Sequence, residues 1–186
     1  MTSAGADSDE AIAAIARTGD RKAFALLVER HKGTIYRFVR RYVGQSDDAY
    51  DVLQDCFIAA WQALSRYDPA RPFLPWLRVI ALNKCRDYGR RQRVRNLVMK
   101  AFALEPNPAP DARENESEAD RLGQLDAAIS RLNPFYKEPL LLTTVSGLSH
   151  IDAAAILKTT PKAVEMRIYR ARKMLLADIG DNSSEG

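Results

Sequence analysis

Hydrophobic side chains recur every three to four residues along most of the chain, which is the spacing of one buried face of an α-helix. The signals of β-strands are missing, because the chain has no alternating β-branched runs and no Asn-Gly or Asp-Gly turns. The pattern predicts helices near residues 8–17, 21–43, 48–66, 74–98, 119–132, 135–146, 149–157 and 161–178. We therefore expect an all-α fold.

A proline-rich and acidic stretch interrupts the helical pattern in the middle of the chain. Three of the nine prolines fall within Leu104–Asp111, and residues 112–118 after them offer almost nothing to bury. We predict a flexible linker here, between two small helical domains. The predicted divisions are an acidic N-terminal segment with the start of the first helix at 1–18, a first domain at 19–100, the linker at 101–118, a helix-turn-helix domain at 119–178 and a disordered tail at 179–186.

The helix predicted at 48–66 has two different faces. At 100° per residue one face is mainly apolar, and it consists of Leu53, Cys56, Phe57, Ala60 and Leu64. The other face is rich in carboxylates and amides, and it consists of Asp51, Gln54, Asp55, Ile58 and Gln62. The pattern alone leaves two interpretations of this second face open, a solvated surface or a contact surface for a partner.

Residues 147–177 have the capping residues of a helix-turn-helix. Gly147 suits the left-handed position that ends one helix, and Ser149 suits the N-cap of the next. Lys158-Thr159 forms the predicted turn. Thr160 can then cap the last helix, whose first position is taken by Pro161, where the missing N–H has no cost.

The last helix separates a buried stripe from a basic face. The predicted stripe consists of Val164, Ile168, Ala171 and Leu175, and the opposite face of Lys162, Met166, Tyr169, Arg170 and Lys173, with Arg167 and Arg172 on the flanks. A tyrosine and a methionine among cations favour insertion into a DNA major groove, where arginines bond guanine or phosphate and apolar groups meet thymine methyls. The alternative is an exposed basic helix without a partner.

Charge is distributed in blocks, although the net charge is only +4. Residues 21–95 carry sixteen basic and seven acidic side chains, and residues 136–178 carry seven basic and four acidic ones. An acidic block at 96–135 separates them. This asymmetry indicates contacts with a polyanion made by two separate units.

Several motifs resemble those of one protein family. Gly19–Leu27 reads GDRKAFALL, Asp51–Trp61 reads DVLQDCFIAAW and Phe73–Asp87 reads FLPWLRVIALNKCRD. The second unit adds Gly147-Leu148-Ser149, Ala154 and the run Arg167–Arg172. In this order and spacing they resemble the extracytoplasmic-function class of bacterial sigma factors in the sigma-70 family.

The resemblance implies an alternative sigma factor that binds core RNA polymerase, recognises minus-ten and minus-thirty-five promoter elements and promotes transcription initiation at a stress or envelope-response regulon. The implied partners are the β′ clamp helices of core polymerase, promoter DNA and an anti-sigma factor, and the free chain is expected to be a monomer. The remaining hypotheses are a self-sufficient helix-turn-helix repressor or activator and a helical adaptor that binds only protein.

The resemblance also assigns roles to individual residues. The implied core-polymerase contacts are Asp51, Gln54, Asp55 and Ile58, with Phe57 packed behind them. The implied minus-ten contacts are Tyr67, Asp68, Ala70, Arg71, Asn83, Arg86 and Arg90, with a loop that holds a flipped base, and further phosphate contacts from Arg91, Arg93 and Arg95. For Tyr67 the sequence alone leaves a second interpretation open, an aromatic ring at a helix end that packs on the core. The implied minus-thirty-five contacts are Lys162, Glu165, Met166, Arg167, Tyr169, Arg170 and Lys173.

Two departures from the family pattern affect base recognition. Glu165 and Met166 stand where the family often has a basic residue and a serine, so the minus-thirty-five sequence cannot be transferred. The predicted minus-ten loop contains prolines and lacks the glycine common in the family, so its base preference is also open.

Other classes of function find no support in the sequence. Two cysteines and two histidines lie too far apart for a metal site, and neither a nucleophile motif nor a phosphate-binding loop is present. We expect no enzymatic activity, no metal and no cofactor. The N-terminus resembles no secretory signal and no apolar run is long enough for a membrane span, so we expect a cytoplasmic protein.

Overall fold

The computed structural model of the chain describes residues 8–101 and 118–182, and this part is helical without strands, as predicted. In chain order the helices are α1 (Asp9–Ala16), α2 (Arg21–Val43), α3 (Ser46–Ala63), the 3₁₀ turn η1 (Leu64–Arg66), α4 (Phe73–Ala101), α5 (Glu118–Arg131), α6 (Pro134–Thr144), α7 (His150–Leu157) and α8 (Pro161–Asn182). None of them has the length and hydropathy needed to cross a bilayer.

Helix ends account for the differences from the predicted elements. The third predicted helix changes into a 3₁₀ turn over its last three residues. Helix α8 runs to Asn182, so its end includes the first residues of the tail that we predicted to be disordered from 179. Helix propagation gains one hydrogen bond per residue, and no proline stops it here. The predicted linker, apart from its first and last residues, lies outside the described residues.

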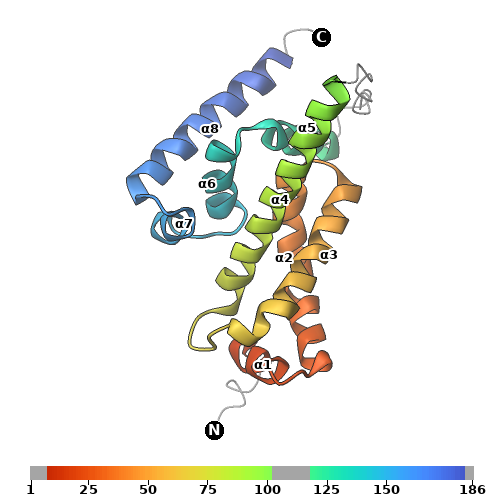
Figure 1. Cartoon of the computed structure of the whole chain (residues 1–186). Helices are drawn as coiled ribbons and strands as arrows, with labels where there is room; N and C mark the ends of the chain where they lie inside the picture. Colours follow the sequence, from red (N-terminus) through yellow and green to blue (C-terminus); the bar gives the residue numbers. More distant parts are fainter. Residues whose placement is uncertain (1–7, 102–117, 183–186) are drawn as a thin grey trace.

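Helices α2, α3 and α4 form a bundle, and α1 crosses its lower end (Figure 1). The bundle buries a continuous apolar core that includes Leu27, Ile35, Phe38, Cys56, Leu64, Leu77 and Ala81. Asp20 caps α2 by accepting hydrogen bonds from the backbone N–H groups of Lys22 and Ala23 at 2.8 and 3.1 Å. The core holds α3 and α4 side by side, so their outer faces form one surface.

Helices α5 to α8 form the second unit, and its predicted caps are confirmed. Ser149 Oγ accepts from the Asp152 N–H at 3.1 Å, and Thr160 Oγ1 accepts from the Ala163 N–H at 3.1 Å. Gly147 has a φ of +65°, in the left-handed region. These local signals fix the angle between α7 and α8 and leave one face of α8 exposed.

The two units pack against each other through α5 and α6, which lie beside α2 (Figure 1). Arg41 of α2 forms an ion pair with Asp126 of α5 at 3.1 Å. Gly44, just after α2, packs so closely on Ser130 that a β-carbon there would lie 2.5 Å from the serine hydroxyl oxygen. The described part of the chain is therefore in a closed arrangement.

Candidate polymerase and nucleic-acid interfaces

The outer face of α3 carries the residues predicted to contact a partner. Asp51 and Gln54 are exposed, and the side chain of Ile58 is 49% exposed beside them. Asp55 is half-buried, since its carboxylate lies 3.5 Å from the guanidinium of Arg91 on α4. On the inner face Cys56 is fully buried, as predicted. Acidic, amide and apolar groups are thus presented together.

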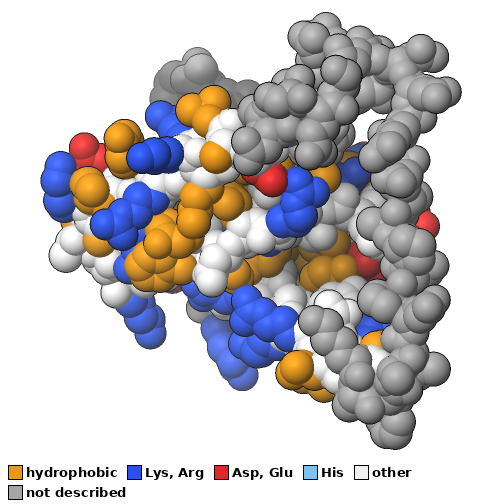
Figure 2. All heavy atoms as spheres, turned by 90° about the horizontal axis from the view of Figure 1, so that it is seen from above, with side chains coloured by type: hydrophobic (Ala, Val, Ile, Leu, Met, Phe, Trp, Pro, Cys, Tyr) orange, Lys and Arg blue, Asp and Glu red, His pale blue; other side chains and the backbone are white. Residues whose placement is uncertain are grey.

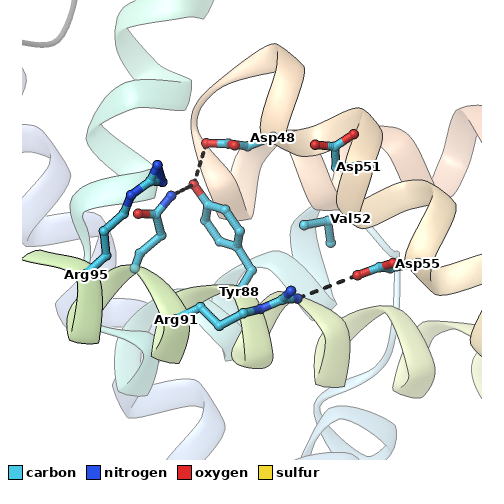
Figure 3. A pocket seen from close by; sticks show the side chains of 8 residues that line it. Asp48, Asp51, Val52, Asp55, Tyr88, Arg91 and Arg95 are labelled. Carbon is cyan, nitrogen blue, oxygen red and sulfur yellow. Dashed lines mark hydrogen bonds and ion pairs between the residues drawn. The ribbon is translucent and has the colours of Figure 1, made fainter.

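An open pocket of about 230 Å³ separates the acidic side of α3 from the basic side of α4 (Figure 3). At one end the hydroxyl of Tyr88 donates to Asp48 Oδ2 at 2.7 Å, and burial raises the pKa of Tyr88 to about 12. At the other end lies the Arg91–Asp55 pair. Asp51, which also lines this pocket, is exposed (Figure 3).

The predicted minus-ten loop runs between η1 and α4, and Tyr67 within it contradicts one prediction. Its side chain is only 2% exposed, and its ring packs edge-on against Phe73 with centroids 5.5 Å apart and against Trp76 at 5.0 Å. The ring is therefore not available to stack on a base. Instead, its hydroxyl donates to the carbonyl of Arg71, which closes the loop.

The remaining loop residues are arranged as a surface. Asp68 Oδ1 accepts from the Ala70 N–H at 3.0 Å, and the Arg71 guanidinium lies 3.6 Å from the Asp68 carboxylate. Asp68, Ala70 and Arg71 are all exposed. The loop consequently has a fixed backbone with three side chains open to a ligand.

Helix α4 supplies the other predicted minus-ten residues, and they differ in availability. Asn83 is exposed, whereas Arg86 is only partly so because its guanidinium is bound by Glu138 of α6. Arg90 is exposed and pairs with Asp87 one turn earlier. In this closed arrangement the Glu138 carboxylate occupies the guanidinium of Arg86, so a phosphate could bind there only after this pair separates.

Helix α8 divides as its sequence predicts. Val164, Ile168, Ala171 and Leu175 are buried, and Lys162, Glu165, Met166, Tyr169, Arg170 and Lys173 are exposed. Tyr169 is 65% exposed. Figure 2 shows many Lys and Arg side chains on the described surface seen from above, with hydrophobic ones between them and few acidic ones. This mixture is typical of helices that read DNA.

Three predicted minus-thirty-five residues have partners within the unit. The Arg167 guanidinium lies over the Phe135 ring, 3.9 Å from its centroid, so this side chain is half-buried rather than free. Lys162 Nζ donates to Glu165 Oε2 at 2.9 Å, and this bond lowers the pKa of Glu165. An open pocket of about 500 Å³ extends from Glu165 to Tyr169 between α6, α7 and α8.

The described residues offer no site for metal binding or for thiol chemistry. They contain no group of three or more His, Cys, Asp and Glu side chains that could hold a metal ion. Both cysteines are buried and free, and burial raises the pKa of Cys56 to about 12. Cys56 is a small core residue, as predicted.

Three residues that are structurally important were not identified from the sequence. Lys137 and Glu138 at the start of α6 are buried and bond to the first unit, where Tyr42 contacts both of them. The available signal was a charged pair inside the apolar run 134–142. Helical periodicity cannot show that such a pair bonds to a distant helix.

Comparisons with known proteins agree with this architecture. The family model described as Sigma-70 region 2 matches residues 27–95, and that described as Sigma-70, region 4 matches residues 122–175. RNA polymerase sigma factor NccH of Alcaligenes xylosoxydans xylosoxydans is 38% identical over 173 residues, which are 91% of this chain and 93% of NccH.

RNA polymerase sigma factor CnrH of Cupriavidus metallidurans is 36% identical over 187 residues, which cover 96% of this chain and 98% of CnrH. The solved structure of CnrH in complex with the cytosolic domain of CnrY superposes with a TM-score of 0.68 over 94% of this chain and 99% of that one.

The chain belongs to the sigma-70 family, in its extracytoplasmic-function class. It is an alternative sigma factor, which binds core RNA polymerase and recognises promoter DNA, and it is not an enzyme.

Proposed function

We propose that the exposed face of α3 docks on the β′ clamp helices of core RNA polymerase through Asp51, Gln54, Asp55 and Ile58. The observation that carries this proposal is the 49% exposure of Ile58 on the same face of α3 as the exposed Asp51 and Gln54. An exposed aliphatic side chain surrounded by acidic and amide groups fits a docking face, which uses such a side chain as an anchor within a polar rim.

The loop before α4 is our candidate for minus-ten recognition. Asp68, Ala70 and Arg71 would meet an unpaired base, and Asn83 and Arg90 would contact the strand beside it. In this proposal Tyr67 shapes the loop from within the core. Arg86 joins the DNA contacts only when Glu138 releases it.

The exposed face of α8 is our candidate for minus-thirty-five recognition in the major groove. Tyr169, Met166 and Arg170 are exposed and central, so they are the candidates for base contacts, and Lys162 and Lys173 would meet phosphates. Glu165 can accept a hydrogen bond from cytosine N4, and Arg167 supports the helix through Phe135.

Family membership supports a proposal for regulation and location. The CnrH structure contains the cytosolic domain of CnrY, and a protein partner of that kind, an anti-sigma factor, is part of our proposal for this chain. A promoter-reading chain works where DNA and polymerase are, so we place it in the cytoplasm, as a monomer when free, serving a stress or envelope-response regulon.

The proposed docking face can be tested with two isoleucines of equal exposure. Ile58→Glu is compared with Ile15→Glu on α1, whose parent side chain is 50% exposed. Burying an isoleucine contributes about 1.5–3 kcal/mol, so Ile58→Glu should weaken binding of labelled chain to core polymerase by roughly 10- to 100-fold. Ile15→Glu should bind like the wild type. Equal binding by both variants would remove α3 from the interface.

A further inference from the structure

A cluster of polar and charged side chains lies where the two units meet, and it includes a buried lysine and a buried glutamate. It consists of Lys137 and Glu138 at the start of α6, which are 5% and 7% exposed, and of Tyr42 on α2 and Arg86 on α4. Lysine and glutamate are rarely buried to this extent unless they are paired. Each member of the cluster bonds across the junction, so it joins the units specifically.

Glu138 binds Arg86 with both carboxylate oxygens. The Nε of Arg86 donates to Oε1 at 2.8 Å and its Nη2 donates to Oε2 at 2.6 Å, while the Tyr42 hydroxyl donates to Oε1 at 3.3 Å. The carboxylate raises the pKa of Arg86. This is the paired geometry that guanidinium groups also use for phosphate.

Lys137 attaches α6 to the end of α2. Its ammonium donates to the carbonyl of Tyr42 at 3.0 Å and to that of Ser130 at 2.6 Å, and it lies 4.5 Å from the centre of the Tyr42 ring. A cation at a helix C-terminus is favourable for the helix dipole. The contact therefore depends on both units being in this one arrangement.

We propose that Glu138 is an intramolecular substitute for a DNA phosphate: it occupies Arg86, holds the units closed in the free chain and lowers DNA affinity until the units separate. This inference rests on the proposed function in one point, that Arg86 belongs to the minus-ten DNA surface. The Glu138 carboxylate and a phosphate cannot both occupy the two Arg86 donors that Glu138 engages.

The chemistry of the cluster suits a junction that opens. A buried ion pair gives little net stability because its desolvation offsets its attraction, and both ions regain water when the units part. Removing Glu138 alone, however, leaves the partly buried Arg86 guanidinium without this partner and destabilises the closed form. Glu138→Gln should therefore shift the chain towards the open form, while it nearly preserves side-chain size.

The first experiment measures closure without polymerase or promoter. A donor and an acceptor fluorophore are attached at Gln62→Cys on α3 and Ala177→Cys on α8, both exposed positions, while the native cysteines are buried. Glu138→Gln should change energy transfer relative to the parent chain. The matched control, Asp178→Asn, removes an equally negative group that pairs with Arg131 inside the second unit and should leave energy transfer unchanged.

The second experiment measures affinity for a 30-base-pair duplex of random sequence at fixed salt. Glu138→Gln should bind about tenfold tighter than the wild type, within the usual range of coupling between sites. In an Arg86→Ala background Glu138→Gln should not increase the affinity for the duplex, because the arginine that Glu138 occupies is absent. A gain equal to that of Asp178→Asn, or one that persists without Arg86, would overturn the proposal.

A cross-link makes the test independent of the folding of the Glu138 variant. Arg41→Cys with Asp126→Cys replaces a pair whose side chains meet across the junction, so a short bis-maleimide can join them. The cross-linked chain should bind the random duplex more weakly than the same chain before cross-linking, and unchanged affinity would contradict autoinhibition. None of these three experiments contains polymerase. A result in which only polymerase docking fails would therefore contradict the proposed function and would not contradict this inference.

Discussion

Glu10 of α1 caps the first turn of α4: its Oε1 accepts a hydrogen bond from the backbone N–H of Phe73 at 3.1 Å. The first N–H groups of a helix have no partner within the helix, and a carboxylate there also interacts favourably with the helix dipole. Since Phe73 directly follows the candidate minus-ten loop, the N-terminal helix holds one end of that loop.

Glu10→Ala should therefore loosen the loop without unfolding the bundle. Loss of a capping acceptor typically costs about 1 kcal/mol, and Glu10→Gln, which keeps an acceptor oxygen, should cost less. Hydrogen exchange of the amides at residues 68–74 should accelerate in Glu10→Ala. If exchange there stayed at the wild-type rate, the hydrogen bond to Phe73 would not be holding the loop.

The free energy of unfolding should depend on pH through Lys137. Burial lowers the pKa of Lys137 to about 8 from its usual 10.5. The titratable and charged groups that face it are Glu138 on its own helix, Tyr42 on α2, and Cys85 and Arg93 on α4. Between these two pH values the unfolded chain binds more protons than the closed one, so stability rises with pH.

The measurement is the free energy of unfolding between pH 7 and 10.5 for wild type and Lys137→Met. Below about pH 8 Lys137 is protonated in both the folded and the unfolded wild type, so the cost of burying its charge is fully present. Above it the wild type should gain roughly 1–3 kcal/mol relative to Lys137→Met. Parallel curves for the two proteins would show that Lys137 keeps its ordinary pKa in the fold.

The accuracy of the sequence predictions depended on how local each signal was. Ser149, Thr160 and Gly147 act within three residues of their own position, so the helix-turn-helix could be predicted in detail. The buried stripe of α8 likewise follows from a period of 3.6 residues. The fold class and the exposed faces of α3 and α8 were therefore predictable.

Contacts between distant segments were not predictable in this way. Arg86 and Glu138 are 52 residues apart, and their pairing depends on how the two units pack. Tyr67 was misassigned for a related reason, since only the aromatic groups of α4, Phe73 and Trp76, show that its ring is enclosed. A polar tip on an aromatic ring fits both a base pocket and a core.

Docking on core polymerase should be sensitive to the sign of charge at residue 51. Asp51→Arg should weaken binding by about 2 kcal/mol or more, which is roughly 30-fold, because a like-charge contact is costly in an interface. Glu29→Arg on α2, where the parent side chain is exposed and pairs with Lys32, is the matched charge-reversal control. The circular dichroism of both should match the wild type, and equal affinities would exclude Asp51 from the docking face.

Two arginines one turn apart on α8 should behave differently. Arg170 is exposed, so Arg170→Ala should weaken binding to minus-thirty-five duplex and, if it meets a phosphate, reduce the slope of log affinity against log salt by about 0.9. Arg167 stacks on Phe135, so Arg167→Ala should lower the melting temperature and leave the slope nearly unchanged. Arg131→Ala, which removes an exposed cation that pairs with Asp178, is the control for net charge. The assignment fails if Arg131→Ala reduces the slope as much as Arg170→Ala does.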